Sequence, residues 1–289
     1  MPALAGTSIG FIGLGLMGKP MARNLNAAGA RLIIYNRSPE PLDELAAEGM
    51  STVASASKAV GEIAIVMVRD SPAVEAVIGG ANGLLESVTP GMLVIDMGTT
   101  DLDVTRRMAE AVRVKGGDYI DAPVSGGQVG AVEGNLTIMA GGSEAAFARA
   151  KLVFETLGSH ITHIGGVGAG QIAKTVNQVI VAMTIDAVAE GLTLAKRSGV
   201  DPARVREALA GGFAASRILE LHGERMLKGS FEPGGRSSLQ LKDVVQALDL
   251  AASVELDLPG LQANRRLWER MVDRGFGDLD QSALIKVIE

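Results

Sequence analysis

The chain has 289 residues, 47% of them hydrophobic and 21% charged, and this length and composition predict a globular protein of two domains. Its formal net charge of −6 argues against a protein that binds nucleic acid electrostatically. The absence of cysteine excludes disulfides, thiolate nucleophiles and metal sites built from cysteine.

From Ser8 to about Ile164, short β-branched runs alternate with segments of helical periodicity. The expected strands are Ser8–Ile12, Arg31–Tyr35, Ile63–Val68, Met92–Asp96, Asp118–Asp121, Leu136–Ala140 and a last one near His160–Ile164. The expected helices between them are Met17–Ala28, Glu40–Gly49, Thr105–Lys115 and Glu144–Leu157. This alternation predicts an α/β domain with a doubly wound parallel sheet, which binds ligands beyond the carboxyl ends of its strands.

After Gly165 the strand pattern stops, and Gly168–Gly199 predicts one long helix that is apolar nearly all round. Further helices are expected from Asp201-Pro202 and at Ala215–Leu227, Ser237–Val254, Leu258–Arg274 and Gln281–Ile288. We therefore expect an α/β domain at residues 1–164 and an all-α domain at residues 165–289.

No membrane segment is expected. The start of the chain lacks the basic region of a signal peptide. The most apolar stretch, Val176–Leu194, is interrupted by four polar or charged residues, which argues against a span. A cytoplasmic protein is the resulting expectation.

A glycine motif follows the first expected strand and opens the first helix: Gly13-Leu14-Gly15-Leu16-Met17-Gly18. In such a G-x-G-x-x-G turn, the first glycine permits the tight turn and the second lets the backbone approach a pyrophosphate. The third glycine lets the helix pack on the strand. Glycines end many strands, but here the strand, helix and second strand all fall in register. The motif therefore predicts dinucleotide binding.

The residues after the second strand, Asn36, Arg37 and Ser38, bear on the choice of cofactor. An Asp or Glu at this place would accept from the ribose 2′-hydroxyl of NAD, and none is present. Arg37 offers a guanidinium that can grip a phosphate, so NADP is favoured over NAD. The alternative is that this segment is only a turn with a solvated arginine.

Two further segments carry polar groups that suit a carboxylate substrate and proton transfer. Ser125 offers a hydroxyl, and Gly126 with Gly127 can expose consecutive N–H groups as an anion nest; the alternative is an ordinary turn. Lys174 lies at the start of the long helix, with Asn177 and Gln178 at i+3 and i+4 on the same face. A lysine in apolar surroundings is a plausible acid–base group, and the alternative is a lysine that extends to solvent.

Metal chemistry is not indicated. The three histidines lack the spacing of metal ligands, and no zinc-protease, serine-hydrolase or P-loop motif is present. Asp70, Asp96 and Asp121 stand at the ends of expected strands, where turn and cap roles explain them as well as a carboxylate cluster would.

Together these motifs resemble the β-hydroxyacid dehydrogenase family, which includes 3-hydroxyisobutyrate dehydrogenases and tartronate semialdehyde reductases. The resemblance spans nearly the whole chain and rests on Gly10–Gly18, Asp121–Gly127, Gly168–Asn177 and Lys242-Asp243. The tartronate semialdehyde reductases are the branch that Lys174–Ala182 and Phe231–Arg236 most resemble.

The resemblance implies an N-terminal Rossmann domain, an all-helical substrate and oligomerisation domain, and a homodimer or homotetramer. It implies Lys174 as the proton-transferring residue, and it places Ser125, Gly126 and Gly127 at the substrate carboxylate. The cofactor is then expected near Met67, Val68, Thr99 and Lys242. Three features depart from the family pattern: Val68-Arg69 in place of Leu-Pro, Gly235 in place of an aromatic residue, and Gln178 in place of Asn.

The expected function is an NADP(H)-dependent reductase or dehydrogenase that interconverts a small 3-oxo (semialdehyde) acid and its 3-hydroxy acid. Its partner is a small carboxylate-bearing aldehyde or hydroxy acid, with no nucleic acid and no membrane. The alternatives are an NAD-dependent 3-hydroxyisobutyrate dehydrogenase, an imine reductase on the same fold, and a non-catalytic NADP-binding scaffold.

Overall fold

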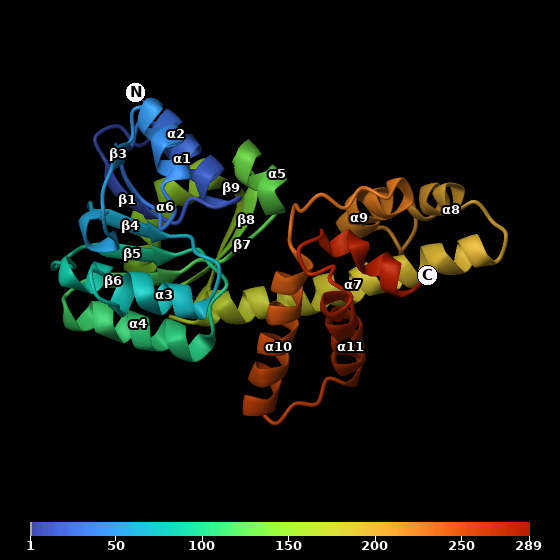
Figure 1. Cartoon of the computed structure of the whole chain (residues 1–289). Coiled ribbons are helices and arrows are strands. Elements are labelled where there is room, and N and C mark those ends of the chain that lie inside the picture. The colour runs from blue at the N-terminus through green and yellow to red at the C-terminus, as the bar shows by residue number, and fades with distance from the viewer. Residues whose placement is uncertain (1) are drawn as a thin grey trace. The chain divides into compact units, whose positions relative to one another are not determined.

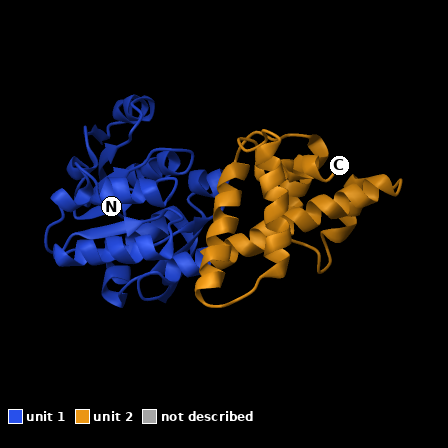
Figure 2. Ribbon diagram, turned by 60° about the horizontal axis from the view of Figure 1, so that its bottom comes forward, with its two compact units in different colours: residues 1–174 blue, residues 175–289 orange. Residues whose placement is uncertain are grey.

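The structure is a computed structural model that describes residues 2–289. The chain divides into two compact units, residues 1–174 and 175–289 (Figure 2). The long helix α7 (Ala169–Arg197) contributes residues to both units.

The first unit contains a sheet of nine strands drawn from the described residues, in the order β3-β2-β1-β4-β5-β6-β8-β7, with β9 paired to β8. Their bounds are β1 Ser8–Ile12, β2 Arg31–Tyr35, β3 Ser51–Thr52, β4 Ile63–Val66, β5 Leu93–Asp96, β6 Asp118–Asp121, β7 Val124–Ser125, β8 Leu136–Gly141 and β9 Gly158–Gly165. Strands β1 to β6 are parallel, so their carboxyl ends share one edge of the sheet. The expected α/β doubly wound fold is confirmed.

One expectation about the sheet is wrong. Strand β8 runs antiparallel to β6 and β7, and β9 is parallel to β8, so β8 and β9 run in the direction opposite to β1–β6. The connection from β6 to β8 explains the reversal: it holds only β7 and the short helix α5 (Gly127–Glu133) and is no crossover with a full helix.

The strands carry apolar side chains on both faces. In β4, Ile63 and Ile65 pack into one core cluster, while Ala64 and Val66 pack into another. This alternation follows from the two-residue period of a strand, and it explains why these strands read as continuous apolar runs.

Helices cover both faces of the sheet. Helices α1, α2 and α6 lie on one face, and α3 and α4 lie on the other (Figure 1). Their bounds are α1 Gly18–Ala27, α2 Glu40–Ala47, α3 Ser71–Gly79, α4 Leu102–Val114 and α6 Glu144–Leu157, with short 3₁₀ helices η1 Ala56–Lys58 and η2 Leu84–Glu86. Helix α3 is absent from the sequence expectations. Its start is fixed by Asp70, whose side chain accepts from the Ala73 N–H at 3.0 Å, a cap role that the sequence indicated.

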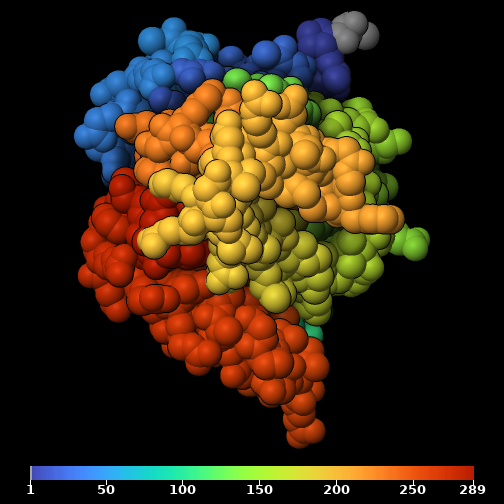
Figure 3. Space-filling view, turned by 90° about the vertical axis from the view of Figure 1, so that its right-hand side faces the viewer, coloured from blue at the N-terminus to red at the C-terminus, as the bar shows by residue number. Residues whose placement is uncertain are grey.

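The second unit is helical, as expected for an all-α domain. After α7 come α8 Pro202–Leu209, α9 Arg217–Lys228, α10 Ser237–Ser253, α11 Pro259–Asp273 and the 3₁₀ helix η3 Gln281–Val287. Figure 3 shows this unit from its surface, with α7 to α9 in yellow and orange and α10 and α11 in red. Its core includes the fully buried Trp268, whose Nε1 donates to the Asn264 side chain at 2.8 Å.

By length and composition alone, α7 is the one helix of residues 2–289 that could cross a membrane, with a mean hydropathy of 1.4. Five of its residues belong to the core of the second unit: Ala182, Ile185, Val188, Ala189 and Leu192. Packing of this kind accounts for the apolar residues on the buried face of α7.

Candidate active site

The glycine motif forms the turn between β1 and α1, and its three glycines have different surroundings. Gly13 has φ +98°, and a Cβ there would lie 2.2 Å from the Met67 carbonyl oxygen. A Cβ on Gly18 would lie 1.9 Å from the Gly13 carbonyl oxygen. A Cβ on Gly15 would meet nothing within 4 Å. Gly13 and Gly18 are therefore required by packing, whereas Gly15 borders open space.

The helix that this turn opens is suited to an anion. Met17 provides no side-chain cap for α1, and its first turn has no acidic residue. Helix N–H groups and the helix dipole attract negative charge at such an end. Leu14, Gly15 and Leu16 line a cavity of about 400 Å³ together with Lys19. The open space at Gly15 and this uncapped helix start fit the diphosphate of a dinucleotide.

The end of β2 lies against the glycine turn. The Asn36 Oδ1 accepts a hydrogen bond from the Leu14 N–H at 3.0 Å, and its Nδ2 donates to the Ser38 carbonyl at 2.9 Å. Arg37 and Ser38 are exposed. Asn36 thus braces the turn, a role that its sequence position did not reveal.

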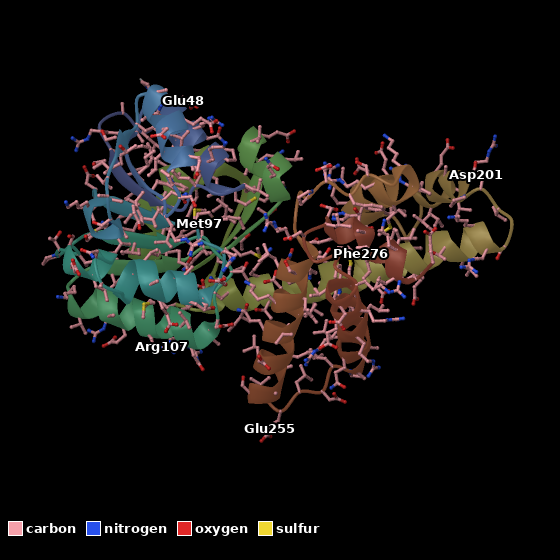
Figure 4. All side chains as sticks on the ribbon, viewed as in Figure 1. Glu48, Met97, Arg107, Asp201, Glu255 and Phe276 are labelled. Atoms are coloured by element: carbon pink, nitrogen blue, oxygen red, sulfur yellow. The ribbon has the colours of Figure 1, made fainter. Side chains whose placement is uncertain are left out.

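Three other expected cofactor contacts, Met67, Val68 and Thr99, lie in the loops after β4 and β5. Met67 and Val68 follow β4, and the Val68 Cγ1 would lie 2.9 Å from a Cβ on Gly13. Thr99 belongs to the loop that follows β5 and begins at Met97, which is labelled in Figure 4. In this loop, a Cβ on Gly98 would lie 2.9 Å from the Val68 carbonyl oxygen. The structure therefore brings the loops after β1, β4 and β5 together at the carboxyl edge of the sheet.

Asp121, at the end of β6, caps the N-terminus of α7. Its Oδ1 accepts from the Gly168 N–H at 2.7 Å and its Oδ2 from the Gln171 N–H at 2.9 Å. Burial raises the pKa of Asp121 to about 7, although these two N–H groups lower it, and the nearby Asp96 carboxylate raises it further. The cap role that the sequence indicated for Asp121 is confirmed, but nothing in the sequence indicates its partners, which lie 47 and 50 residues away.

The Ser125–Gly127 segment turns from β7 into α5. Ser125 pairs with Thr137 of β8 and is half-buried, whereas Gly126 and Gly127 are exposed. Gly126 has φ +132° and Gly127 has φ +61°, which favours glycine at both positions. A Cβ on Gly127 would meet nothing within 4 Å, so a ligand can approach this backbone closely.

The residues expected on the long helix belong to different units. Lys174 is 8% exposed and is the last residue of the first unit. In the second unit, the Asn177 Nδ2 donates to the Gln178 Oε1 at 2.8 Å, and the Gln178 Nε2 donates to the Asp243 Oδ2 at 2.5 Å. Lys242 forms an ion pair with Asp243 at 3.1 Å. Gln178 and Lys242 thus converge on one carboxylate of α10.

Family models match nearly the whole chain. Residues 8–165 match the NAD binding domain of 6-phosphogluconate dehydrogenase, and residues 168–288 match the NAD-binding domain of NADP-dependent 3-hydroxyisobutyrate dehydrogenase. The 2-hydroxy-3-oxopropionate reductase of Escherichia coli is 47% identical over 283 residues, which cover 97% of both chains. The chain belongs to the β-hydroxyacid dehydrogenase family.

Other members of the β-hydroxyacid dehydrogenase family support this assignment. The mitochondrial 3-hydroxyisobutyrate dehydrogenase of the mouse is 35% identical, over 98% of this chain and 87% of that protein. The solved structure of a 3-hydroxyisobutyrate dehydrogenase from Salmonella typhimurium has a TM-score of 0.89 at 29% identity and covers 97% of this chain and 99% of its own. The chain described here is therefore an oxidoreductase that uses a nicotinamide cofactor.

Proposed function

We propose that the chain is a tartronate semialdehyde reductase: it reduces the aldehyde of 2-hydroxy-3-oxopropionate, a small 3-oxo acid, to the primary alcohol with NADPH. The observation that carries the proposal is the 47% identity to the E. coli 2-hydroxy-3-oxopropionate reductase over 97% of both chains. The mouse 3-hydroxyisobutyrate dehydrogenase is less similar, at 35% identity. The reaction is reversible, and the relative concentrations of the semialdehyde and the hydroxy acid decide its direction.

Lys174 is the proposed proton donor. When bound, the nicotinamide supplies a hydride to the aldehyde carbon. The Lys174 ammonium donates a proton to the carbonyl oxygen, so that hydride and proton together account for the alcohol. Its exposure of only 8% supports this role, because a buried donor is held in place and shielded from water.

The substrate carboxylate is assigned to Ser125, Gly126 and Gly127. The positive φ angles of both glycines and the open space at Gly127 support close approach of an anion to their N–H groups. Asn177 and Gln178 are proposed as further substrate contacts. Fixing the carboxylate at one end and the carbonyl at the other leaves the aldehyde carbon with one orientation.

NADP is the proposed cofactor. The glycine motif and the start of α1 take the diphosphate, and Arg37 with Ser38 takes the 2′-phosphate. The exposure of Arg37 and Ser38, and the absence of a carboxylate at position 36, support this preference. Met67, Val68, Thr99 and Lys242 are the remaining proposed contacts of the cofactor.

The proposed domain boundary follows residue 164. The first domain, residues 1–164, binds NADP, and the second, residues 165–289, binds the substrate and forms the oligomer. The family matches at residues 8–165 and 168–288 support this division. The proposed assembly is a homodimer or homotetramer in the cytoplasm.

The test is a panel of tartronate, methylmalonate and succinate semialdehydes, glyoxylate and cyclic imines, each followed by the absorbance of NADPH or NADH in the wild type and the Lys174→Ala variant. We expect the highest kcat/KM with tartronate semialdehyde, and no turnover by the variant although it still binds NADPH. Lys196→Ala is the control, because Lys196 is an exposed lysine at the end of the same helix.

Three outcomes contradict the proposal in different ways. Higher kcat/KM with methylmalonate semialdehyde and NADH indicates a 3-hydroxyisobutyrate dehydrogenase. Turnover of cyclic imines alone indicates an imine reductase. NADPH binding without turnover of any substrate indicates a scaffold.

A further inference from the structure

Gln171 lies one turn before Lys174 on α7 and is 1% exposed. Both ends of its side-chain amide bond to the loop after β5. The Nε2 donates to the Gly98 carbonyl at 2.9 Å, and the Oε1 accepts from the Thr100 N–H at 3.0 Å. The two bonds flank Thr99, the residue proposed to contact the nicotinamide. One side chain therefore links this loop to the start of α7.

The start of α7 is itself held firmly. Asp121 accepts from the N–H groups of Gly168 and Gln171, so the backbone that carries the Gln171 side chain is fixed. A Cβ on Gly170 would lie 2.4 Å from the Met139 carbonyl oxygen and 2.5 Å from the Asp121 carbonyl oxygen. Such close packing leaves this turn of the helix no room to shift against the sheet.

The other side of the loop is held by Asp96, at the end of β5. Its Oδ1 accepts from the Gly98 N–H at 3.0 Å, and its Oδ2 accepts from the Thr100 Oγ at 2.7 Å. The Tyr119 hydroxyl donates to the same Oδ2 at 3.3 Å. Gly98–Thr100 is thus bonded from the sheet by Asp96 and from α7 by Gln171.

We propose that Gln171 is a positioning residue that fixes the loop carrying Thr99 relative to the helix turn carrying Lys174. The inference rests on the proposed function, in which these two residues serve the nicotinamide and the proton transfer. Gln171 touches neither substrate nor cofactor in this role. It acts by fixing the place of the proton donor relative to the hydride source, and a displacement of about 1 Å in such geometry lowers rates about 100-fold.

The first test is the Gln171→Met variant, which keeps the length of the side chain and removes both hydrogen bonds. At saturating NADPH and semialdehyde, we expect kcat to fall about 100-fold. The KM for the semialdehyde and the affinity for NADPH should change less than about threefold, because the residues proposed to bind them are intact. Thr105→Val is the control, since Thr105 is a buried residue of the same unit whose hydroxyl has no hydrogen-bond partner.

The second test is the Gln171→Glu variant, which separates positioning from a purely structural role and stays informative if Gln171→Met does not fold. A protonated carboxyl group can donate to the Gly98 carbonyl and accept from the Thr100 N–H, as the amide does. An ionised carboxylate cannot donate to the carbonyl. The ratio of variant to wild-type kcat should therefore be near one at low pH and fall at least about tenfold as the introduced group ionises.

The titratable groups around position 171 are Asp121 and Tyr119 of β6, Asp96 of β5, and Lys174 of α7. The kcat of the variant is therefore divided by that of wild type at the same pH, so that titration of these four groups, which both proteins share, does not enter the ratio. The inference is overturned if Gln171→Met keeps kcat within about twofold of wild type, or if the Gln171→Glu ratio does not change with pH. Failure of the proposed function is a different result: turnover by Lys174→Ala, whatever the Gln171 variants do.

Discussion

The side-chain oxygen of Asn36 accepts a hydrogen bond from the backbone N–H of Leu14 at 3.0 Å. This bond ties the end of β2 to the glycine turn, across 22 residues of sequence. It occupies the Asn36 oxygen and leaves the adjacent Arg37 exposed. In the proposed NADP complex, Asn36 therefore shapes the turn, and Arg37 supplies the charge for the 2′-phosphate.

Asn36→Asp should reverse the cofactor preference. The introduced carboxylate loses the bond to the Ser38 carbonyl but can still accept from the Leu14 N–H. It can also accept from the 2′-hydroxyl of NADH. It repels a 2′-phosphate. We expect kcat/KM for NADPH to fall about 10- to 100-fold, as for loss of a charge-assisted contact, and that for NADH to rise.

Arg37→Ala is the matched variant, and initial rates with both cofactors are the measurement. This change should lower kcat/KM for NADPH to a similar extent, with no gain for NADH, because it adds no acceptor for the 2′-hydroxyl. Equal effects of either variant on both cofactors would contradict the assignment of the 2′-phosphate to this turn.

Gly15→Ala should weaken NADPH binding, whereas Gly18→Ala should lower the stability of the fold. A methyl group at Gly15 meets no protein atom within 4 Å, so the fold is kept while the diphosphate loses its close approach. A methyl group at Gly18 would meet the Gly13 carbonyl oxygen at 1.9 Å, which forces α1 away from the turn. We expect Gly15→Ala to weaken NADPH binding at least about tenfold with unfolding unchanged, and Gly18→Ala to destabilise the protein by about 2–3 kcal/mol.

Fluorescence titration with NADPH and urea denaturation measure the two effects separately. Equal losses of affinity and stability in both variants would contradict the distinction between a ligand-facing and a packing glycine.

Much of the fold follows from local sequence. The bounds expected for Ser8–Ile12 and Glu144–Leu157 are those of the structure, because apolar periodicity and flanking turn residues mark both ends. Helix α3 has a signal in the sequence: Asp70 followed by Ser71-Pro72 is a cap with proline in the first turn. Helix α5 offered none, since it spans seven residues and includes Gly127 and Gly130.

The site is harder to predict, because its contacts join distant segments. Sequence position marked Asp121 as a residue at a strand end, and the structure supplies its partners in Gly168 and Gln171. Gln171 itself has no motif position that signals its bonds to Gly98 and Thr100. Residue type indicates which chemistry is present, but which groups meet depends on strand order.

Asp121 should make stability depend on pH between about 4 and 7. Its pKa is about 7 in the folded chain, against 3.8 ordinarily, chiefly because of burial. A carboxyl whose pKa is raised by folding stabilises the folded state fully below the unfolded pKa. That stabilisation is lost as pH rises through the folded pKa. The free energy of unfolding of wild type relative to Asp121→Asn should therefore fall by about 3 kcal/mol from pH 4 to pH 7.

Urea denaturation of both proteins across this range is the measurement. Asp118→Asn is the control, because Asp118 lies on the same strand in an exposed ion pair with Arg149. A constant difference between wild type and Asp121→Asn from pH 4 to pH 7 would show that Asp121 does not titrate there.

Asp280 should stabilise the second unit by binding five hydrogen-bond donors from α9, the loop before α10 and the start of η3. Its Oδ2 accepts from the N–H groups of Gly234 and Gly235 and pairs with Arg225 at 2.7 Å, while its Oδ1 accepts from the Ser282 N–H and hydroxyl. Burial raises the pKa of Asp280, but the Ser282 bonds and the Arg225 charge outweigh it and leave the pKa below its ordinary value.

Asp280→Asn replaces an acceptor oxygen with an N–H donor, which must then face one of these donors. We expect a loss of about 2–3 kcal/mol at pH 7 by urea denaturation, less than for a fully buried pair because Arg225 is partly exposed. A carboxylate whose pKa folding lowers stabilises above its unfolded pKa. The advantage of wild type should therefore shrink as pH falls below about 4. Asp278→Asn is the control, because Asp278 lies in an exposed ion pair with Arg236. It should change the free energy of unfolding by less than about 0.5 kcal/mol. A similar loss of stability in both variants would contradict the role of Asp280.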